Sequence, residues 1–379
     1  MSRLPLVAIN AASFHLDPKL HVVPTDSVAR RKGARAAEWD GLENRCGCMP
    51  TVGSNPTPSA TRHEVTHAMS QPDQQGTIVV TGVAGFIGSA VARRLVAEGF
   101  RVVGVDDLST GKLTNVPPDV AFVQADVSSA ESVRLLPKRA KAILHLAGQS
   151  SGEISFEDPI ADLEKNTVST LRLVEYARAS EIRRLLYASS MSVYGATPDA
   201  PTDESAPTTP LSCYGVGKLA SESYLRIFVG AVSSTSLRMF NVYGPGQDLD
   251  NLRQGMISIY LAQAHRTGHI KVKGDSRRFR DFIYIDDVVE AWFRCLCLTQ
   301  PHEPVLNIGS GIRTQVSDVL ELITALMPEV TIETAAGTPG DQFGIYSDNS
   351  RMRAALGMEQ LTTLAVGLRT FWQSVRNTQ

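Results

Sequence analysis

The chain has 379 residues, 43% hydrophobic and 20% charged, a balance that is ordinary for a globular protein and argues against global disorder. Its net charge of −2 gives no broad electrostatic attraction to nucleic acid or to an anionic membrane. Five Cys are too few for a disulfide framework, and no apolar run reaches the ~18 residues of a membrane helix, so we expect a soluble cytoplasmic enzyme or ligand-binding protein.

Residues 1–75 lack the hydrophobic periodicity that marks the rest of the chain, and we expect them to be a disordered leader. The segment 53–60 (GSNPTPSA) resembles the product of a transfer-RNA gene translated upstream of a true start. By this hypothesis the leader is not native and the protein begins at Met69. The N-terminal mass of the native protein tests it, because a chain that retains residues 1–68 contradicts it.

The leader also contains a zinc-like pattern. Residues 63–67 (HEVTH) fit H-E-x-x-H, and Cys46 and Cys48 lie upstream. Prolines bracket the histidines and no apolar helix face accompanies them. We therefore predict no metal site.

The folded part is predicted to begin with a strand over residues 77–81, a glycine-rich turn and a helix from Ser89 to Gly99. This order places backbone N–H groups and the positive end of a helix against a pyrophosphate, although a lone motif of this kind can also be a simple turn. The candidate cofactor-binding residues in the turn are Gly82, Gly85, Phe86, Ile87 and Gly88.

The next strand, over residues 101–105, ends at Asp106, which lies 18 residues after Gly88. An acidic side chain there accepts the adenosine ribose hydroxyls and repels a 2′-phosphate, which favours NAD over NADP. Strands over 120–123 and 142–146 follow. After the first of them, Asp126 and Val127 are candidates for contact with the adenine, but Asp126 can equally cap a helix starting near Ser128.

This run of βα units predicts an α/β fold, a Rossmann-type doubly wound parallel sheet with its ligand at the carboxyl edge. A further strand over residues 185–190 runs into hydroxyl side chains and ends at Ser190. Tyr214 and Lys218 follow on a predicted helix and share one face, four residues apart. A phenol is a poor base at pH 7, and a nearby cation lowers its pKa toward the working range.

Together these residues resemble the extended short-chain dehydrogenase/reductase family of sugar-nucleotide epimerases and dehydratases, and the resemblance covers residues 76–379. The motifs that carry it are Thr81-Gly82-x-x-Gly85-x-x-Gly88, Asp106, His145-Leu146-Ala147-Gly148, Ser190 ahead of Val193-Tyr194-Gly195, Tyr214-x-x-x-Lys218, residues 238–246 (RMFNVYGPG) and residues 280–288 (RDFIYIDDV).

The resemblance implies an NAD lobe at about 76–240, completed by parts of the C-terminal half, and a nucleotide-sugar lobe mainly at 241–379. It implies that Tyr214 is the base, that Lys218 binds the nicotinamide ribose and tunes the base, and that Ser190 hydrogen-bonds the reacting oxygen. Asn166 matches a helix asparagine near the site.

For the substrate, the resemblance implies that Asn241 and Arg280 contact the diphosphate and that Asp341 lies near the nucleotide ribose. A charge-assisted contact to phosphate suits an arginine, but an ion pair between Arg280 and its neighbour Asp281 is the simpler alternative.

Departures from the family pattern narrow the reaction. Met191 and Ser192 stand where 4,6-dehydratases carry an acidic pair, and Ser192 stands where UDP-glucuronate decarboxylases carry an acidic residue. Neither side chain can protonate a leaving hydroxyl. Thr338 replaces a phosphate-binding arginine of galactose-pathway epimerases, which weakens the assignment to UDP-glucose. Ile345 stands where some of those epimerases have a tyrosine that excludes N-acetyl groups, so we expect a pocket that admits larger hexoses.

The resemblance therefore implies an NAD-dependent isomerase that epimerises a nucleotide-linked hexose at C4 through a 4-keto intermediate, of the UDP-glucose/UDP-galactose type or its N-acetyl analogue. NAD should stay tightly bound, and no metal is needed. Two alternatives stay open: a nucleotide-sugar 4-ketoreductase or dehydrogenase that releases NAD(H), and a non-catalytic NAD-binding sensor.

The family also implies a homodimer formed by helices near 159–179 and 214–229, and a place in the synthesis of polysaccharide precursors. The expected partner is a nucleotide-sugar substrate, with no nucleic acid and no membrane.

Overall fold

The computed structural model describes residues 76–253, 255–299, 304–337 and 343–377. The leader with its H-E-x-x-H pattern, the Cys46–Cys48 pair and the proposed start at Met69 lie outside the described residues. So do Thr338 and Asp341.

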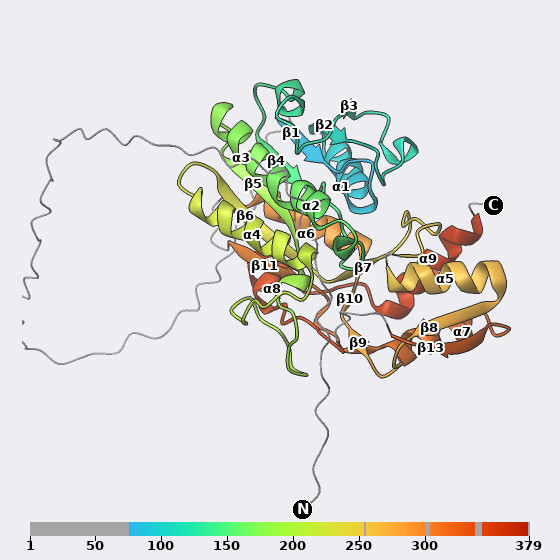
Figure 1. The fold of residues 1–379 in the computed structure, drawn as a ribbon. Helices are drawn as coiled ribbons and strands as arrows, with labels where there is room; N and C mark the ends of the chain where they lie inside the picture. Colours follow the sequence, from blue (N-terminus) through green and yellow to red (C-terminus); the bar gives the residue numbers. More distant parts are fainter. Residues whose placement is uncertain (1–75, 254, 300–303, 338–342, 378–379) are drawn as a thin grey trace, which may run out of the picture. The chain divides into compact units, whose positions relative to one another are not determined.

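A seven-stranded parallel sheet forms the centre of the fold, in the order β11-β6-β5-β4-β1-β2-β3 (Figure 1). This confirms the predicted Rossmann-type architecture. Its strands are β1 Thr77–Thr81, β2 Arg101–Asp106, β3 Ala121–Gln124, β4 Ala142–His145, β5 Arg184–Ser190, β6 Ser233–Met239 and β11 Val305–Ile308. Strand β11 comes from late in the chain and pairs with β6, so the C-terminal half contributes to the central sheet.

Helices cover both faces of this sheet. Successive side chains of a strand point to opposite faces, and because buried strands such as β1 are apolar on both faces, both must be covered. In β1, Ile78 and Val80 pack with helices α1 and α6. Val79, between them, packs with α3 and α4 on the other face. These helices are α1 Phe86–Ala97, α3 Ser169–Ala179, α4 Cys213–Ile227 and α6 Ile285–Cys297.

The segment predicted to be one helix over 159–179 is interrupted by a different helical form. It consists of α2 Pro159–Leu163, a π-helical turn Glu164–Val168, and α3. A π-helical turn carries one extra residue per turn, and such turns are frequent at functional sites. Here the turn contains Asn166. The helix predicted to start near Ser128 is wrong, because the chain there forms only a 3-10 turn, Ser132–Leu135.

The C-terminal half adds a smaller group of helices and short sheets beside the carboxyl edge (Figure 1). Strand β8 pairs with β13, β7 with β10, and β9 with β12. Their bounds are β7 Asn241–Tyr243, β8 His269–Lys273, β9 Phe279–Arg280, β10 Phe282–Tyr284, β12 Thr314–Gln315 and β13 Thr331–Ala335. The remaining helices are α5 Met256–Thr267, α7 Val316–Leu326, α8 Ser350–Leu356 and α9 Leu364–Asn377.

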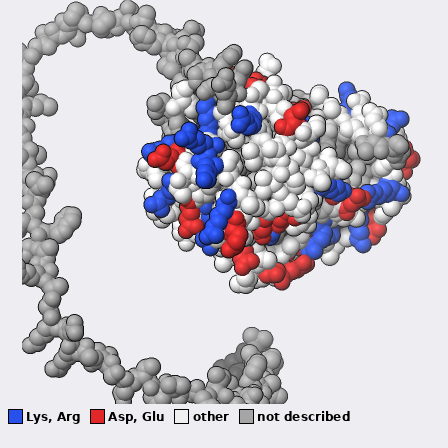
Figure 2. All heavy atoms as spheres, turned by 90° about the horizontal axis from the view of Figure 1, so that it is seen from above, with Lys and Arg blue, Asp and Glu red and all other residues white. Residues whose placement is uncertain are grey.

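Surface charge on the face drawn in Figure 2 is mixed: basic and acidic side chains alternate around an uncharged area. No helix among the described residues is long and apolar enough to cross a membrane. Within the same residues no cluster of three or more His, Cys, Asp or Glu could hold a metal ion. Cys295 and Cys297 are buried and Cys213 is half-buried, all as free thiols.

Candidate active site

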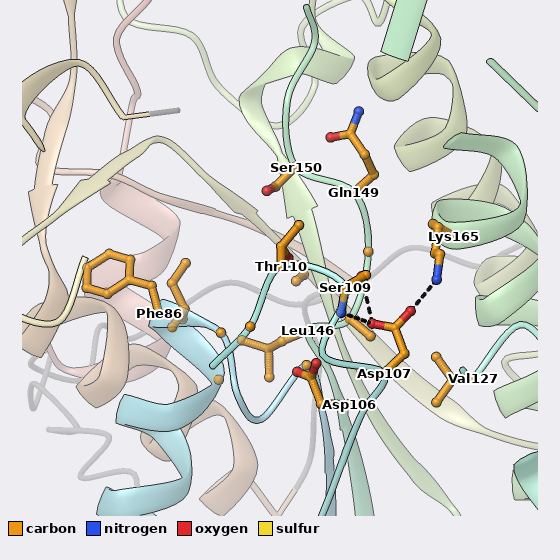
Figure 3. A pocket seen from close by; sticks show the side chains of 18 of the residues that line it. Phe86, Asp106, Asp107, Ser109, Thr110, Val127, Leu146, Gln149, Ser150 and Lys165 are labelled. Atoms are coloured by element: carbon orange, nitrogen blue, oxygen red, sulfur yellow. Dashed lines mark hydrogen bonds and ion pairs between the residues drawn. The ribbon is translucent and has the colours of Figure 1, made fainter. Parts of the chain in front are cut away.

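A cavity of about 400 Å³ lies at the carboxyl ends of strands β1 to β4, where the parallel sheet predicts a ligand. Figure 3 shows the side chains that line it, with Phe86 on one side, Asp106 and Asp107 below, and Lys165 opposite. Ten of the residues predicted to bind the cofactor line this cavity: Gly82, Gly85, Phe86, Ile87, Gly88, Asp106, Asp126, Val127, Tyr214 and Lys218. Asn166, the eleventh, is fully buried and is not among the lining residues.

Two glycines allow the close approach of the turn that the cavity needs. Gly82 has φ +71°, and a Cβ on it would lie 2.6 Å from the backbone nitrogen of Ala147. A Cβ on Gly88 would lie 2.0 Å from the carbonyl oxygen of Gly82. No other residue type fits either place. Helix α1 therefore begins directly against the cavity, where its N-terminal N–H groups favour a phosphate.

Asp106 ends β2 and is 9% exposed. Its Oδ2 accepts a hydrogen bond from the backbone of Ala84 at 3.0 Å, and its Oδ1 accepts one from Leu108 at 2.9 Å. Burial nevertheless raises the pKa of this carboxyl. The side chain is thus fixed beside the glycine turn, as a residue that accepts ribose hydroxyls must be.

Asp126 caps a turn. Its Oδ1 accepts from the backbone and the hydroxyl of Ser128, at 2.9 and 2.8 Å. Its Oδ2 receives Lys165 Nζ at 3.0 Å, and the same ammonium forms an ion pair with Asp107 (Figure 3). Lys165 and Asp107 were missed by the sequence analysis, because a charged residue on a helix or loop looks like an ordinary solvated position.

The proposed catalytic groups Tyr214 and Lys218 are among the residues that line this cavity. Tyr214 is 9% and Lys218 is 4% exposed. Burial raises the pKa of Tyr214 to about 12, although a hydrogen bond with the Ser190 side chain opposes this. The Lys218 Nζ lies 5.6 Å from the centre of the Tyr214 ring, and burial lowers its pKa to about 8. Desolvation of the Tyr214 phenol therefore outweighs the hydrogen bond with Ser190, and the charge of Asp162 raises the pKa of Tyr214 further.

Asn166 and Gly148 supply a direct test of whether a dinucleotide fits here. The Oδ1 of Asn166 is buried and has no hydrogen-bond partner among the described residues. A Cβ on Gly148 would lie 2.6 Å from that oxygen and 3.3 Å from Lys218 Nζ. An acceptor and a donor thus both lie close to Gly148, where a side chain would clash with the acceptor, and Gly148 and Lys218 both line the cavity. A buried unpaired acceptor is costly, and a pair of ribose hydroxyls would satisfy both groups.

A second cavity, of about 380 Å³, lies between the sheet edge and the C-terminal half. Ser150 lines both cavities, so the two meet. The predicted substrate residues Asn241 and Arg280 line the second one. Its other basic lining residues are Arg253, Lys271, Lys273 and Arg278.

Arg280 does not pair with its neighbour, which removes the simpler alternative for this residue. The Asp281 carboxylate is fully buried and instead accepts hydrogen bonds from Ser310, Gly311 and Ser347. Arg280 Nη1 donates to the carbonyl oxygens of Phe279 and Phe343, at 2.8 and 3.2 Å. Burial, together with the neighbouring Arg278, lowers the pKa of Arg280 to about 10.

Met191 and Ser192 line the second cavity beside Ser190, so no acidic side chain stands at these two positions of the site. Ile345 is fully buried with Val193 and Phe240 and lines neither of the two cavities. That the pocket admits larger hexoses, which was expected from the absence of a tyrosine at this position, stays a prediction.

The doubly wound sheet, the glycine turn at the start of α1 and the strand-end aspartate define a dinucleotide-binding enzyme fold. A model of the NAD dependent epimerase/dehydratase family matches residues 78–309, and the chain belongs to that family. It is an NAD-dependent enzyme of the epimerase type.

Relatives and solved structures agree with this assignment. UDP-glucose 4-epimerase of Mycolicibacterium smegmatis is 36% identical over 318 residues, which are 79% of this chain and 98% of that protein. The crystal structure of UDP-glucose 4-epimerase with UDP-glucose from Thermotoga maritima is similar with a TM-score of 0.76 and 31% identity, covering 80% of this chain and 99% of that one. The crystal structure of UDP-glucose 4-epimerase of Thermus thermophilus in complex with NAD is similar with a TM-score of 0.73 and 30% identity, covering 80% of this chain and 100% of that one.

Proposed function

We propose that the protein epimerises a nucleotide-linked hexose at C4, of the UDP-glucose/UDP-galactose type or its N-acetyl analogue. The observation that carries the proposal is the meeting of two different cavities. Tyr214 and Lys218 line the dinucleotide cavity, and the basic cavity, which suits a diphosphate, is lined by Met191 and Ser192, the residues that follow Ser190. A sugar joined to a diphosphate in the second cavity would reach the groups at the end of the first.

In this proposal each side chain has one task. Tyr214 removes the proton of the sugar 4-hydroxyl and later returns it, while Ser190 hydrogen-bonds the same oxygen and Tyr214. The Lys218 ammonium favours the phenolate form of the base and donates to a ribose hydroxyl, while Asn166 Oδ1 accepts a hydrogen bond from one. Bound NAD supplies the acceptor and then the donor of the hydride at C4.

The substrate itself is held by Asn241 and Arg280. Arg280 is the better diphosphate ligand of the two, because its guanidinium keeps its charge at neutral pH even though burial lowers its pKa. Holding the diphosphate while the sugar remains free to turn would let the keto sugar present its other face. The proposal needs no additional acid, which agrees with Met191 and Ser192 lining the cavity where dehydration would require one.

The proposal is tested by incubating the purified protein with UDP-glucose, UDP-galactose and their N-acetyl counterparts, without added NAD, and following the sugars by proton NMR. Interconversion at C4 is the expected result, and it would also demonstrate a retained cofactor. No change with any substrate, even after NAD is added, would overturn the proposal. Consumption of added NAD or NADH in step with the sugar would instead identify a dehydrogenase or ketoreductase.

We also propose that the protein is a homodimer through helices α2 and α4, which pack side by side. Their outward side chains are apolar and exposed: Ile160 65%, Val216 55% and Ile227 72%. Three large apolar side chains on one pair of helices favour a protein partner. Sedimentation should give a dimer, and the double variant Ile160→Glu/Ile227→Glu should sediment as a monomer. A parent protein that sediments as a monomer would contradict the proposal.

A further inference from the structure

One buried carboxylate in the dinucleotide cavity has no role in the mechanism above. Asp162, in helix α2, is 2% exposed, and it lines the same cavity as Tyr214 and Lys218. Its Oδ1 accepts a hydrogen bond from Asn166 Nδ2 at 3.0 Å. Burying a carboxylate is expensive, and a carboxylate that stays buried without an arginine partner calls for an explanation.

Asp162 faces the helix that carries the proposed catalytic pair. Gly217 lies between Tyr214 and Lys218 on α4, and a Cβ there would be 3.6 Å from Asp162 Oδ2 and 3.3 Å from the Asn166 Cβ. The absence of a side chain at Gly217 thus lets α2 and the π-helical turn pack directly against α4.

The hydrogen bond from Asn166 to Asp162 fixes which way the Asn166 amide points. An amide has one donor end and one acceptor end, and the reverse orientation would set Oδ1 against a carboxylate. With Nδ2 on Asp162, Oδ1 must face the space at Gly148 that it shares with Lys218 Nζ. The orientation of an amide that faces the ribose space is therefore decided by Asp162.

The charge of Asp162 acts on both members of the pair. A negative charge nearby opposes the effect of burial on Lys218 and so raises its pKa, and it also raises the pKa of Tyr214. Lys218 in turn favours the ionised form of Asp162, whose pKa burial raises.

The other titratable groups around this pair do not compete for these roles. His145 on β4 is fully buried and stays neutral, because burial lowers its pKa to about 3, and burial raises the pKa of Tyr187 on β5. Lys165, on the same helical segment as Asp162, is held by Asp107 and Asp126.

We infer that Asp162 is a positioning residue for the proposed reaction, which orients the Asn166 amide toward the ribose space and supplies the counter-charge that keeps Lys218 cationic beside Tyr214. The inference rests on the proposed epimerase function. The proposed roles of Tyr214, Lys218 and Asn166 follow from the family resemblance. The role inferred for Asp162 follows instead from its burial and its contacts.

The test is the pH dependence of Asp162→Asn in the full chain with its NAD. Removing the negative charge lowers the pKa of both Tyr214 and Lys218. The acid limb of the rate profile, where the base must be ionised, and the alkaline limb, where Lys218 must be protonated, should therefore both move to lower pH by about one unit. Asp162→Glu, which keeps the charge, should leave both limbs in place while lowering the rate.

A second readout does not depend on turnover. The tyrosinate absorption that appears on raising the pH, taken as the difference between the parent and Tyr214→Phe, should move to lower pH in an Asp162→Asn background. Glu164→Gln is the matched control, because Glu164 is an exposed carboxylate two residues from Asp162 on the same helical segment and lines neither of the two cavities. That control should keep both limbs where they are.

Several results would overturn the inference. A purely structural role would lower the rate of Asp162→Asn without moving either limb or the Tyr214 titration. Circular dichroism and NAD content establish that each variant is folded, and Asp162→Ser repeats the test should the asparagine variant not fold. Failure of both neutral variants to fold would assign Asp162 to stability alone. A parent protein without epimerase activity would refute the proposed function, and the Tyr214 titration would still decide the role of Asp162.

Discussion

The ion pair behind the proposed active site gives the most direct energetic prediction. Arg238 on β6 and Glu222 on α4 form two parallel hydrogen bonds, with Nε 2.9 Å and Nη2 2.7 Å from the carboxylate oxygens. Each side chain is 5% exposed, and the Ser189 hydroxyl donates to the same carboxylate. Arg238→Met leaves this carboxylate buried with the serine as its remaining described side-chain partner. We expect the loss of a buried partner to cost about 3–5 kcal/mol of unfolding free energy.

The assay is urea denaturation of NAD-free protein, because bound cofactor would add stability by mass action. Arg172→Met is the matched control: it breaks an exposed pair with Glu175 and should cost less than about 1 kcal/mol. The double variant Arg238→Met/Glu222→Leu should recover most of the loss, since an apolar pair of similar volume often replaces a buried ion pair at little cost. A loss below about 1 kcal/mol for Arg238→Met, or a double variant as unstable as the single one, would refute the reasoning.

Three further substitutions test the cavities one group at a time. Tyr214→Phe should lower kcat by roughly 10²–10⁴-fold through loss of the general base, with NAD content unchanged; loss of the cofactor instead would assign Tyr214 to binding. Arg280→Met should raise KM for the nucleotide sugar by roughly 10-fold or more, through the loss of a charge-assisted phosphate contact, and a change confined to kcat would contradict this. Gly88→Ala should yield protein without NAD, because its Cβ would overlap the Gly82 carbonyl; ultraviolet absorbance of nucleotide released from the denatured protein measures this, and full NAD content would contradict the role of the turn.

The sequence could predict the elements that depend on local signals. The run 77–81 is β-branched and buried on both faces, and the glycines after it occupy places that no side chain can enter. The predicted strands accordingly match the observed ones to within one or two residues, and the strand-end residues Asp106 and Ser190 stand at the edge where the parallel sheet places ligands. Local composition decides these features, and the handedness and order of βα units follow from it.

The features that depend on long-range packing could not be predicted. Asp126 has the side chain of a helix cap, but no helix starts near Ser128. In the fold Asp126 caps an isolated turn and forms an ion pair with Lys165, which lies far away in the sequence. Ile345 is directed into the core beside Val193 and Phe240, which its place in the sequence does not indicate. Asp162 looked like one more charged residue on a helix. Only the packing of α2 against α4, permitted by Gly217, brings its carboxylate toward the catalytic pair.

The near-zero net charge of the chain does not reveal that the two cavities are lined mainly by charges of opposite sign. Among the described residues, six Asp and two Lys line the dinucleotide cavity, whereas five basic residues and one Glu line the other. The acidic lining favours the ribose hydroxyls of NAD over a further phosphate, and the basic lining attracts a diphosphate, so each cavity disfavours the ligand of the other. Salt screens the exposed part of this field, which includes Lys271 and Lys273. We therefore expect KM for the nucleotide sugar to rise with ionic strength while NAD stays bound, as measured by initial rates and by NAD content at low and high salt. A KM that does not change with salt would mean that the basic cavity acts through short hydrogen bonds of buried groups such as Arg280, and that its exposed lysines contribute nothing to binding.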